Sequence, residues 1–257
     1  MKKTIMAIGA HSDDIEFQAG GTLAKYIDEG YKGVYIVATD DSAGINLDEN
    51  GEYKRFVLPL ESQSIRHGEA GRAAAVFGLK PVFLNFKQRF CCDREGNFYY
   101  LGTEEYRKLC IPGSRECILV APEKKDCIDL LADMIKKEEP EIVLTQQLDI
   151  DPEHRNVCSL VYRAFKQAVQ EVRLGSLYSW GPSSAGEIRH VEPDMLVDIS
   201  RHFKTKLEAF YIHRSQVGKR LKTIANCRAE TWGQKLGVSH AEAFIKVLPA
   251  GPDEYSA

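Results

Sequence analysis

Short apolar runs alternate with amphipathic stretches in the first third of the chain. Residues 4–9, 33–39 and 81–84 are mainly apolar, a pattern typical of strands that are buried on both faces of a parallel sheet. Between these runs, apolar residues recur at helical spacing from Gly20 onward and again over residues 62–77. The pattern therefore predicts strands joined by helices, with a polar loop between the first strand and the first helix.

The alternation returns in the second half of the chain. It predicts helices over residues 126–137, 154–172 and 204–213, and strands over residues 141–145, 177–180 and 195–199. Residues 86–122 keep neither period, so we expect a long irregular excursion of the kind that forms lids or binding loops. Because the sequence contains no linker, it predicts one α/β domain over residues 1–257, built on a mostly parallel sheet flanked by helices.

Polar residues gather where the predicted strands end. The segments 10–16, 39–43 and 146–154 each follow a strand and are rich in acidic residues, histidine or both. Ligands of parallel α/β sheets bind outside the carboxyl ends of the strands. We therefore expect the functional site at this edge of the sheet, with the irregular excursion beside it.

Composition narrows the kind of ligand. The 34 Lys and Arg residues against 37 Asp and Glu residues leave a net charge of -3, which gives no electrostatic basis for binding nucleic acid or a membrane surface. A chain of 257 residues can bury a core without disulfides or a structural metal, so we expect any metal site to serve function. A small-molecule ligand is the default expectation, and a homo-oligomer is compatible with the sequence.

Cysteine usage and hydropathy indicate the compartment. The seven cysteines are unevenly spaced, and Cys91 and Cys92 are adjacent, which fits neither a zinc ribbon nor a redox Cys-x-x-Cys pair. We expect reduced thiols. No apolar run approaches the roughly 18–20 residues of a membrane span, and the N-terminal apolar stretch is too short for a signal peptide. These observations predict a cytoplasmic protein without a membrane partner.

A candidate metal site follows from the residues after two of the strands. His11, Asp13 and Asp14 follow the first strand, and His154 follows a later one. Catalytic zinc typically uses three protein ligands of the imidazole and carboxylate type and leaves one position for water. His11, Asp14 and His154 could supply that set, and Asp13 could accept a proton from the water. The alternative is that residues 12–14 cap a helix and that His154 lies on a solvated helix end.

The residues at these positions resemble a known family. Residues 10–16 read Ala-His-Ser-Asp-Asp-Ile-Glu and residues 20–22 read Gly-Gly-Thr. This pair resembles the Ala-His-Pro-Asp-Asp-x-Glu signature and the downstream Gly-Gly-Thr of the PIG-L/LmbE-like deacetylases. Matches continue at residues 65–70 (Ile-Arg-His-Gly-Glu-Ala), 142–145, 152–155 (Pro-Glu-His-Arg), 206–216 and 241–244 (Ala-Glu-Ala-Phe), so the resemblance spans almost the whole chain.

The resemblance implies a Rossmann-like fold and zinc-dependent hydrolysis of an N-acetyl group from an N-acetylglucosamine-type amino sugar or its glycoside. By position, His11, Asp14 and His154 match the metal ligands of one Zn²⁺, and Asp13 matches the general base. Arg66 stands where family members hold substrate or shape the pocket. Asp41, after the second strand, could contact a sugar hydroxyl, although turns at strand ends use the same residue types.

The sequence departs from the family pattern at two positions. Ser12 replaces a proline, which removes no functional group. Asp151-Pro152-Glu153-His154 stands where the family often has His-Pro-Asp-His, so an imidazole thought to act on the tetrahedral intermediate is absent. An ionised Asp151 would repel the developing oxyanion, whereas a protonated one could donate a hydrogen bond to it.

Asp151 could alternatively orient another histidine, with His67, His213 and His240 as candidates. We therefore expect Asp13 and Asp151 to be catalytic and Arg66, Asp41, His213 and His240 to bind substrate. Two rival functions stay open. One is a metal-dependent phosphohydrolase, although the chain shows no cluster of phosphate-binding arginines. The other is a carbohydrate-binding relative that has lost turnover, which the Asp151 departure motivates.

Overall fold

An eight-stranded mixed sheet forms the centre of the molecule. The computed structural model describes residues 2–48, 51, 54–148, 150–181 and 192–248, so both ends of the predicted 1–257 domain lie outside the described residues. The strands are β1 (Thr4–Gly9), β2 (Lys32–Thr39), β5 (Pro81–Lys87), β8 (Arg115–Cys117), β9 (Ile142–Thr145), β10 (Ser176–Trp180), β11 (Met195–Asp198) and β12 (Ala241–Leu248). Their order is β11-β12-β10-β9-β1-β2-β5-β8, and every pairing is parallel except those of β12. This confirms the predicted α/β fold.

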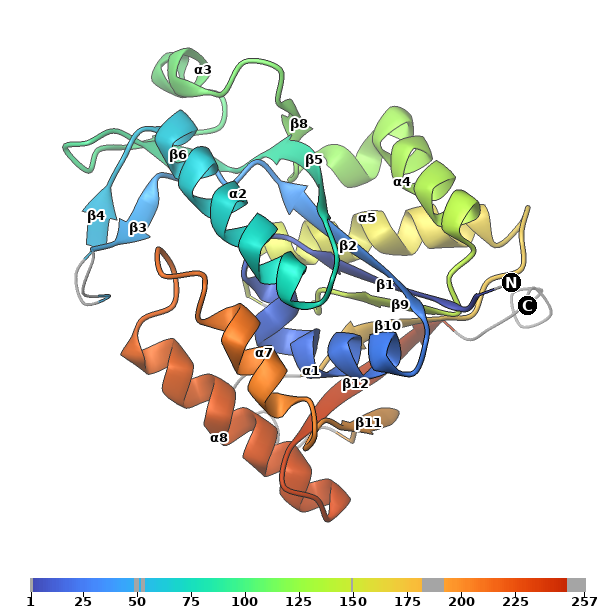
Figure 1. Cartoon of the computed structure of the whole chain (residues 1–257). Helices are drawn as coiled ribbons and strands as arrows, with labels where there is room; N and C mark the ends of the chain where they lie inside the picture. The colour runs from blue at the N-terminus through green and yellow to red at the C-terminus, as the bar shows by residue number, and fades with distance from the viewer. Residues whose placement is uncertain (1, 49–50, 52–53, 149, 182–191, 249–257) are drawn as a thin grey trace.

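Helices cover both faces of the sheet (Figure 1). One layer contains α1 (Asp14–Asp28), α2 (Pro59–Val76), α7 (Phe203–Phe210) and α8 (Lys219–Leu236), and the other contains α4 (Lys125–Glu138) and α5 (Pro152–Ala168). Successive residues of β1 point to opposite faces: Ile5 and Ala7 join the core under α1, whereas Met6 and Ile8 join the core under α4 and α5. Each face of the sheet therefore has its own hydrophobic core.

The excursion over residues 86–122 contains more regular structure than expected. It holds β6 (Phe90–Cys92), β7 (Phe98–Tyr100), α3 (Glu104–Leu109), β8 and the short 3-10 helix η1 (Ala121–Glu123). β6 and β7 form an antiparallel hairpin, as do β3 (Ile45–Leu47) and β4 (Lys54–Phe56). These elements have three to six residues, too few for hydrophobic periodicity to be visible. The expectation of an irregular segment was therefore wrong for these stretches.

Helix α1 begins at Asp14, earlier than the sequence predicted. Its buried residues Ile15, Ala19 and Leu23 recur at helical spacing and pack in the core. The two glycines lie in the middle of this helix because neighbouring segments come close there. A Cβ on Gly21 would lie 2.7 Å from Ile199 Cδ1, a distance that real Cβ atoms do not adopt.

A buried ion pair ties the C-terminal strand to the middle of α1. Glu242 of β12 accepts hydrogen bonds from the peptide N–H groups of Gly21, at 3.1 Å, and Thr22, at 2.7 Å. Lys206 of α7 donates to the same carboxylate at 2.5 Å and to the carbonyl oxygen of Phe17 at 2.8 Å. Segments that the sequence places more than 200 positions apart thereby fix the position of the helix that starts at the candidate site.

The topology reverses direction at the carboxyl ends of the central strands. β1 pairs with β2 on one side and with β9 on the other. The chain leaves β1 into α1 on one face of the sheet, whereas α5 follows β9 on the opposite face (Figure 1). A reversal of this kind is where ligands bind in open α/β sheets. Among the described residues, no helix is long and apolar enough to cross a membrane.

Candidate metal centre

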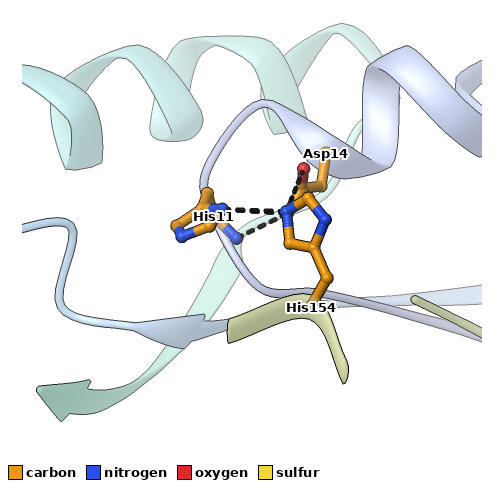
Figure 2. A group of neighbouring side chains, drawn as sticks. All are labelled: His11, Asp14 and His154. Atoms are coloured by element: carbon orange, nitrogen blue, oxygen red, sulfur yellow. Dashed lines mark hydrogen bonds and ion pairs between the residues drawn. The ribbon is translucent and has the colours of Figure 1, made fainter. Parts of the chain in front are cut away.

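Three predicted metal ligands meet at the carboxyl ends of these strands (Figure 2). His11 lies in the turn after β1, Asp14 begins α1, and His154 lies in the first turn of α5. One ligand atom from each lies within 4.8 Å of the others. His11 Nδ1 and His154 Nε2 are 3.3 Å apart, and each lies 3.5–3.6 Å from an oxygen of Asp14. The structure thus brings together residues from two separate strand–helix junctions.

These separations fit a divalent cation of zinc size. Bonds of about 2.0–2.1 Å arranged as a tetrahedron place their ligand atoms about 3.3 Å apart. The three side chains are shielded, with relative exposures of 14% for His11, 12% for Asp14 and 19% for His154. Two imidazoles and one carboxylate are also the donor types of catalytic zinc. The residues present therefore fit a tetrahedral metal with one open position.

Contacts behind the ligands set which atoms face the cluster. His11 Nε2 lies 2.7 Å from Glu153 Oε2, so His11 Nδ1 is the nitrogen left to face the other ligands. Asp14 Oδ2 accepts the His11 backbone N–H at 2.7 Å and the side-chain amide of Gln146. This arrangement matches the carboxylate–histidine pairs that orient metal ligands in general.

The pKa values of these groups follow from the same contacts. Burial alone would raise the pKa of Asp14, but the His154 charge and the hydrogen bonds from His11 hold it well below its ordinary value. Burial opposes the charged form of His11, yet hydrogen bonds to Asp14 and Glu153 raise its pKa well above the ordinary range. Burial likewise disfavours the Glu153 carboxylate, whereas the bond from His11 lowers its pKa to about 2. Both carboxylates are therefore ionised at neutral pH.

Asp13 lies next to the cluster and is not used as a helix cap. It occupies the N-cap position of α1 but makes no capping hydrogen bond, and its side chain is 19% exposed. Arg66 of α2 lies 3.4 Å from Asp13 Oδ1 and 2.9 Å from Asp41 Oδ1. The alternative that residues 12–14 serve as a cap thus has no cap bond to support it at Asp13.

Asp41 and Arg66 are both buried beneath Asp13. Asp41 is fully buried at a positive φ of 54°, where it accepts a hydrogen bond from the Ser12 hydroxyl. Arg66 is 5% exposed. Burial opposes its charge, but Asp41 and Asp13 raise the pKa of the guanidinium. The geometry places these two predicted substrate residues in an ion-pair network that supports Asp13.

Asp151 is the N-cap residue of α5 and contacts both Arg89 and the helix backbone. Its Oδ1 accepts the Glu153 N–H at 2.7 Å, as an N-cap does, and lies 3.4 Å from Arg89 Nη1. The Arg89 backbone N–H in turn donates to Glu153 Oε1 at 2.6 Å. Asp151 therefore fixes the first turn of α5, which carries His154.

The three candidate histidines named from the sequence occupy different surroundings. His213 follows α7, is fully buried and has Nε2 3.4 Å from Glu16 Oε2. His67 stacks on Phe83 with ring centroids 3.7 Å apart and lies 3.8 Å from Asp41 Oδ2. His240 stacks on Phe203 at 3.7 Å and hydrogen-bonds with residues 199, 200 and 239. The described contacts of His240 thus lie in the β11–β12 region, away from the metal cluster.

Sequence reasoning missed two residues that contact the ligands, Glu153 and Gln146, and a third, Gln88, that contacts Glu153. Glu153, Gln88 and Gln146 are 2%, 3% and 1% exposed and hydrogen-bond to one another or to His11 and Asp14. For Glu153 a signal existed, because it is a carboxylate directly before a ligand, at the place of the family aspartate. The two glutamines had no signal, since buried amides carry no motif.

A separate cavity lies in the excursion and shares no residue with the metal cluster. Its volume is about 290 Å³, and it is lined by Lys87, Leu101, Gly102, Tyr106, Arg107, Cys110, Glu116 and Cys117. Nearby, Phe98 and Tyr100 of the β6–β7 hairpin are 42% and 57% exposed. The Phe98 ring contacts the rings of Phe56 and Phe90, and the Tyr100 ring contacts that of Phe90.

Comparisons with known proteins agree with the geometry. Diacetylchitobiose deacetylase of Thermococcus kodakarensis is 27% identical over 83% of this chain and 70% of its own. A probable N-acetyl-alpha-D-glucosaminyl L-malate deacetylase of Bacillus cereus is 24% identical over 84% of both chains. The crystal structure of GalB, a 4-carboxy-2-hydroxymuconate hydratase of Pseudomonas putida, shares the fold with a TM-score of 0.67 at 21% identity, over 98% of both chains.

The family assignment rests on a match to a family model. The sequence model of the family PIG-L, described as GlcNAc-PI de-N-acetylase, matches residues 6–165. This region covers more than half of the chain, and it includes the three ligands, Asp13 and the strands that position them. The chain therefore belongs to the PIG-L family.

Proposed function

We propose that this protein is a zinc-dependent deacetylase that hydrolyses the acetamide of an N-acetylglucosamine-type amino sugar or glycoside. The observation that carries the proposal is the His11–Asp14–His154 cluster with Asp13 beside it. The Asp13 carboxylate is partly exposed and makes no capping hydrogen bond. The names of the two curated relatives, both deacetylases of N-acetylated sugars, support the substrate class. The fold alone does not separate this reaction from hydration, because a hydratase shares it.

Each residue of the site has its own role in the proposed hydrolysis. A zinc ion held by His11, Asp14 and His154 would polarise the amide carbonyl and lower the pKa of a water molecule. Asp13 accepts a proton from that water, and the water oxygen attacks the carbonyl carbon. Arg66 holds the Asp13 carboxylate toward the site. Asp13 then gives the proton to the leaving nitrogen, so that the C–N bond breaks and acetate and a free amine are released.

Asp151 enters this proposal through the helix that it caps. The family imidazole at this position is replaced by a carboxylate that pairs with Arg89. Arg89 therefore supplies a positive charge close to the first turn of α5, where the family has a histidine. We propose that Asp151 and Arg89 together act on catalysis at this position, with Asp41 and His213 as further candidates on the Asp13 side of the site.

Replacement of Asp13 tests the proposed base. The Asp13→Asn variant should bind one zinc per chain, as the wild type does, because Asp13 is outside the ligand set. Its kcat for acetate release should fall about 10²–10⁴-fold, the usual contribution of a positioned general base. Asp28→Asn is the matched control, since Asp28 is at the far end of the same helix, and its kcat should stay within about two-fold.

A substrate screen separates the rival functions. Zinc-loaded protein is incubated with N,N'-diacetylchitobiose, N-acetylglucosaminyl malate and other N-acetylated glycosides, and acetate is measured. Phosphate release from sugar phosphates would instead identify a phosphohydrolase, and water addition to an unsaturated acid would identify a hydratase. Bound zinc with no turnover of any substrate would favour a carbohydrate-binding protein. Full kcat in Asp13→Asn would contradict the role of Asp13.

We also propose that the protein works in the cytoplasm. All seven cysteines are free, and five of them are buried, as in proteins of reducing compartments. Cell fractionation tests this proposal, and recovery from an oxidising compartment would contradict it. Size-exclusion chromatography with light scattering determines whether the protein is a homo-oligomer.

A further inference from the structure

Two buried glutamines flank the metal cluster, one on each side. Gln88 directly follows β5 and is 3% exposed, and Gln146 directly follows β9 and is 1% exposed. Gln88 contacts Glu153 and Gln146 contacts Asp14. The sequence suggested no function for either residue.

The amide of Gln88 has one orientation because of its other partner. The backbone N–H of Ala43 donates to Gln88 Oε1 at 2.7 Å. A peptide N–H cannot accept a hydrogen bond, so the oxygen of the amide must face Ala43. Gln88 Nε2 therefore faces Glu153 Oε2, at 2.9 Å, and donates to it.

The same argument applies to Gln146. The indole Nε1–H of Trp180, at the end of β10, donates to Gln146 Oε1 at 2.9 Å. An indole nitrogen is a donor only, so Gln146 Oε1 must face Trp180. Gln146 Nε2 is thereby turned toward Asp14 Oδ2.

These two orientations determine which ligand atoms are free. The ionised Glu153 Oε2 accepts from both Gln88 Nε2 and His11 Nε2, so Nδ1 is the His11 nitrogen that is turned toward the cluster. Asp14 Oδ2 accepts from Gln146 and from the His11 backbone, so Asp14 Oδ1 is left beside His154 Nε2. The donor–acceptor pattern of the site thus begins at Ala43 and Trp180.

We propose that Gln88 and Gln146 are positioning residues of the metal centre, which hold Glu153 and Asp14 so that His11 Nδ1 and Asp14 Oδ1 face one ion. The proposal rests on the metal site of the proposed function. It also gives the excursion a role, because the Tyr106 hydroxyl of α3 donates to the backbone oxygen of Gln88. The segment beside the site thereby supports the metal ligands.

Zinc affinity is the decisive measurement. Three apo-proteins each compete for zinc against a chelator of known affinity: the wild type, Gln88→Met and Gln146→Met. Loss of one outer hydrogen bond should raise the zinc Kd about 10–100-fold, the usual effect of removing a group that orients a ligand. At saturating zinc, kcat should fall while KM for the sugar stays within about two-fold, since both side chains are buried behind the ligands.

The control is a buried glutamine elsewhere. Gln18 is 6% exposed and accepts a hydrogen bond from Arg228, so Gln18→Met removes a comparable buried amide without touching a ligand contact. It should lower Tm and leave the zinc Kd unchanged. The visible spectrum of the cobalt(II)-loaded protein gives a second readout, and it should change in the Gln88 and Gln146 variants and not in Gln18→Met.

Milder variants cover the case in which a methionine variant does not fold. Gln88→Asn and Gln146→Asn keep a polar amide but are one methylene too short to bridge both partners, and they should also weaken zinc binding. Variants that bind zinc as tightly as the wild type, at whatever Tm, would overturn the proposal. Wild-type protein that binds zinc and releases no acetate would instead refute the deacetylase proposal and leave this one to be judged by Kd alone.

Discussion

His213 is a fully buried imidazole that faces a buried carboxylate. Its Nε2 lies 3.4 Å from Glu16 Oε2, and the Tyr35 hydroxyl donates to the same carboxylate at 2.9 Å. Burial lowers the pKa of His213, but the charge of Glu16, with smaller contributions from Asp13 and Glu69, raises it above the ordinary value. The folded protein therefore binds this proton more tightly than the unfolded chain.

This shift predicts a pH-dependent contribution to stability. The stabilisation by protonated His213 is fully present below the unfolded-state pKa of about 6.5 and is lost as pH rises through the higher folded-state pKa. Urea unfolding of the wild type and His213→Leu should therefore give a larger difference in the free energy of unfolding at pH 6 than at pH 9. An equal difference at both pH values would show that His213 contributes by packing alone.

At the same scale, the sequence predicted the residues that form a contiguous motif. His11, Asp13 and Asp14 are neighbours in the chain, and His154 lies in a turn that resembles the family pattern. Glu153, Gln88 and Gln146 act through contacts between residues 142, 65 and 132 positions apart. Such contacts depend on the register of the sheet, which a single sequence does not reveal.

At the scale of the elements, a substitution in α1 tests whether Gly21 is required for close packing. Gly21→Ala would place a Cβ 2.7 Å from Ile199, and overpacking of this kind should reduce the free energy of unfolding by about 1–3 kcal/mol. Gly71 lies inside α2, and a Cβ there would meet no atom within 4 Å. Gly71→Ala should instead increase stability by roughly 0.5–1 kcal/mol through helix propensity. Chemical denaturation measures both, and equal effects of one sign would contradict the packing argument.

Elements with a regular apolar period could be predicted from the sequence. Two long elements without such a period, α8 and β12, were missed. The buried face of α8 consists of Ala225, Arg228, Ala229, Trp232 and Gly233, so small and charged residues hide its period. In β12, the buried Glu242 interrupts the apolar run because it pairs with Lys206. Both elements are defined by tertiary partners that a local pattern does not contain.

For the whole molecule, the two cores imply that the fold does not need the metal. Hydrophobic clusters fill both faces of the sheet, whereas the metal ligands lie at its edge. Protein treated with EDTA should keep its far-UV circular dichroism signal at 25 °C and should no longer release acetate from substrate. Added zinc should restore the acetate-releasing activity. Free zinc at 100 times its Kd should add about 2.7 kcal/mol to the free energy of unfolding. Loss of the circular dichroism signal on chelation would contradict this expectation.

The metal centre also dictates an order of assembly. His11 and His154 are separated by 143 positions, and the strands before them pair directly. Trp180, which orients Gln146, comes later still. A nascent chain that ends before β9 carries two of the three ligands, so the complete site forms after more than half of the polypeptide has been synthesised. Metal binding by all three ligands therefore requires that β9 has already been synthesised and paired with β1.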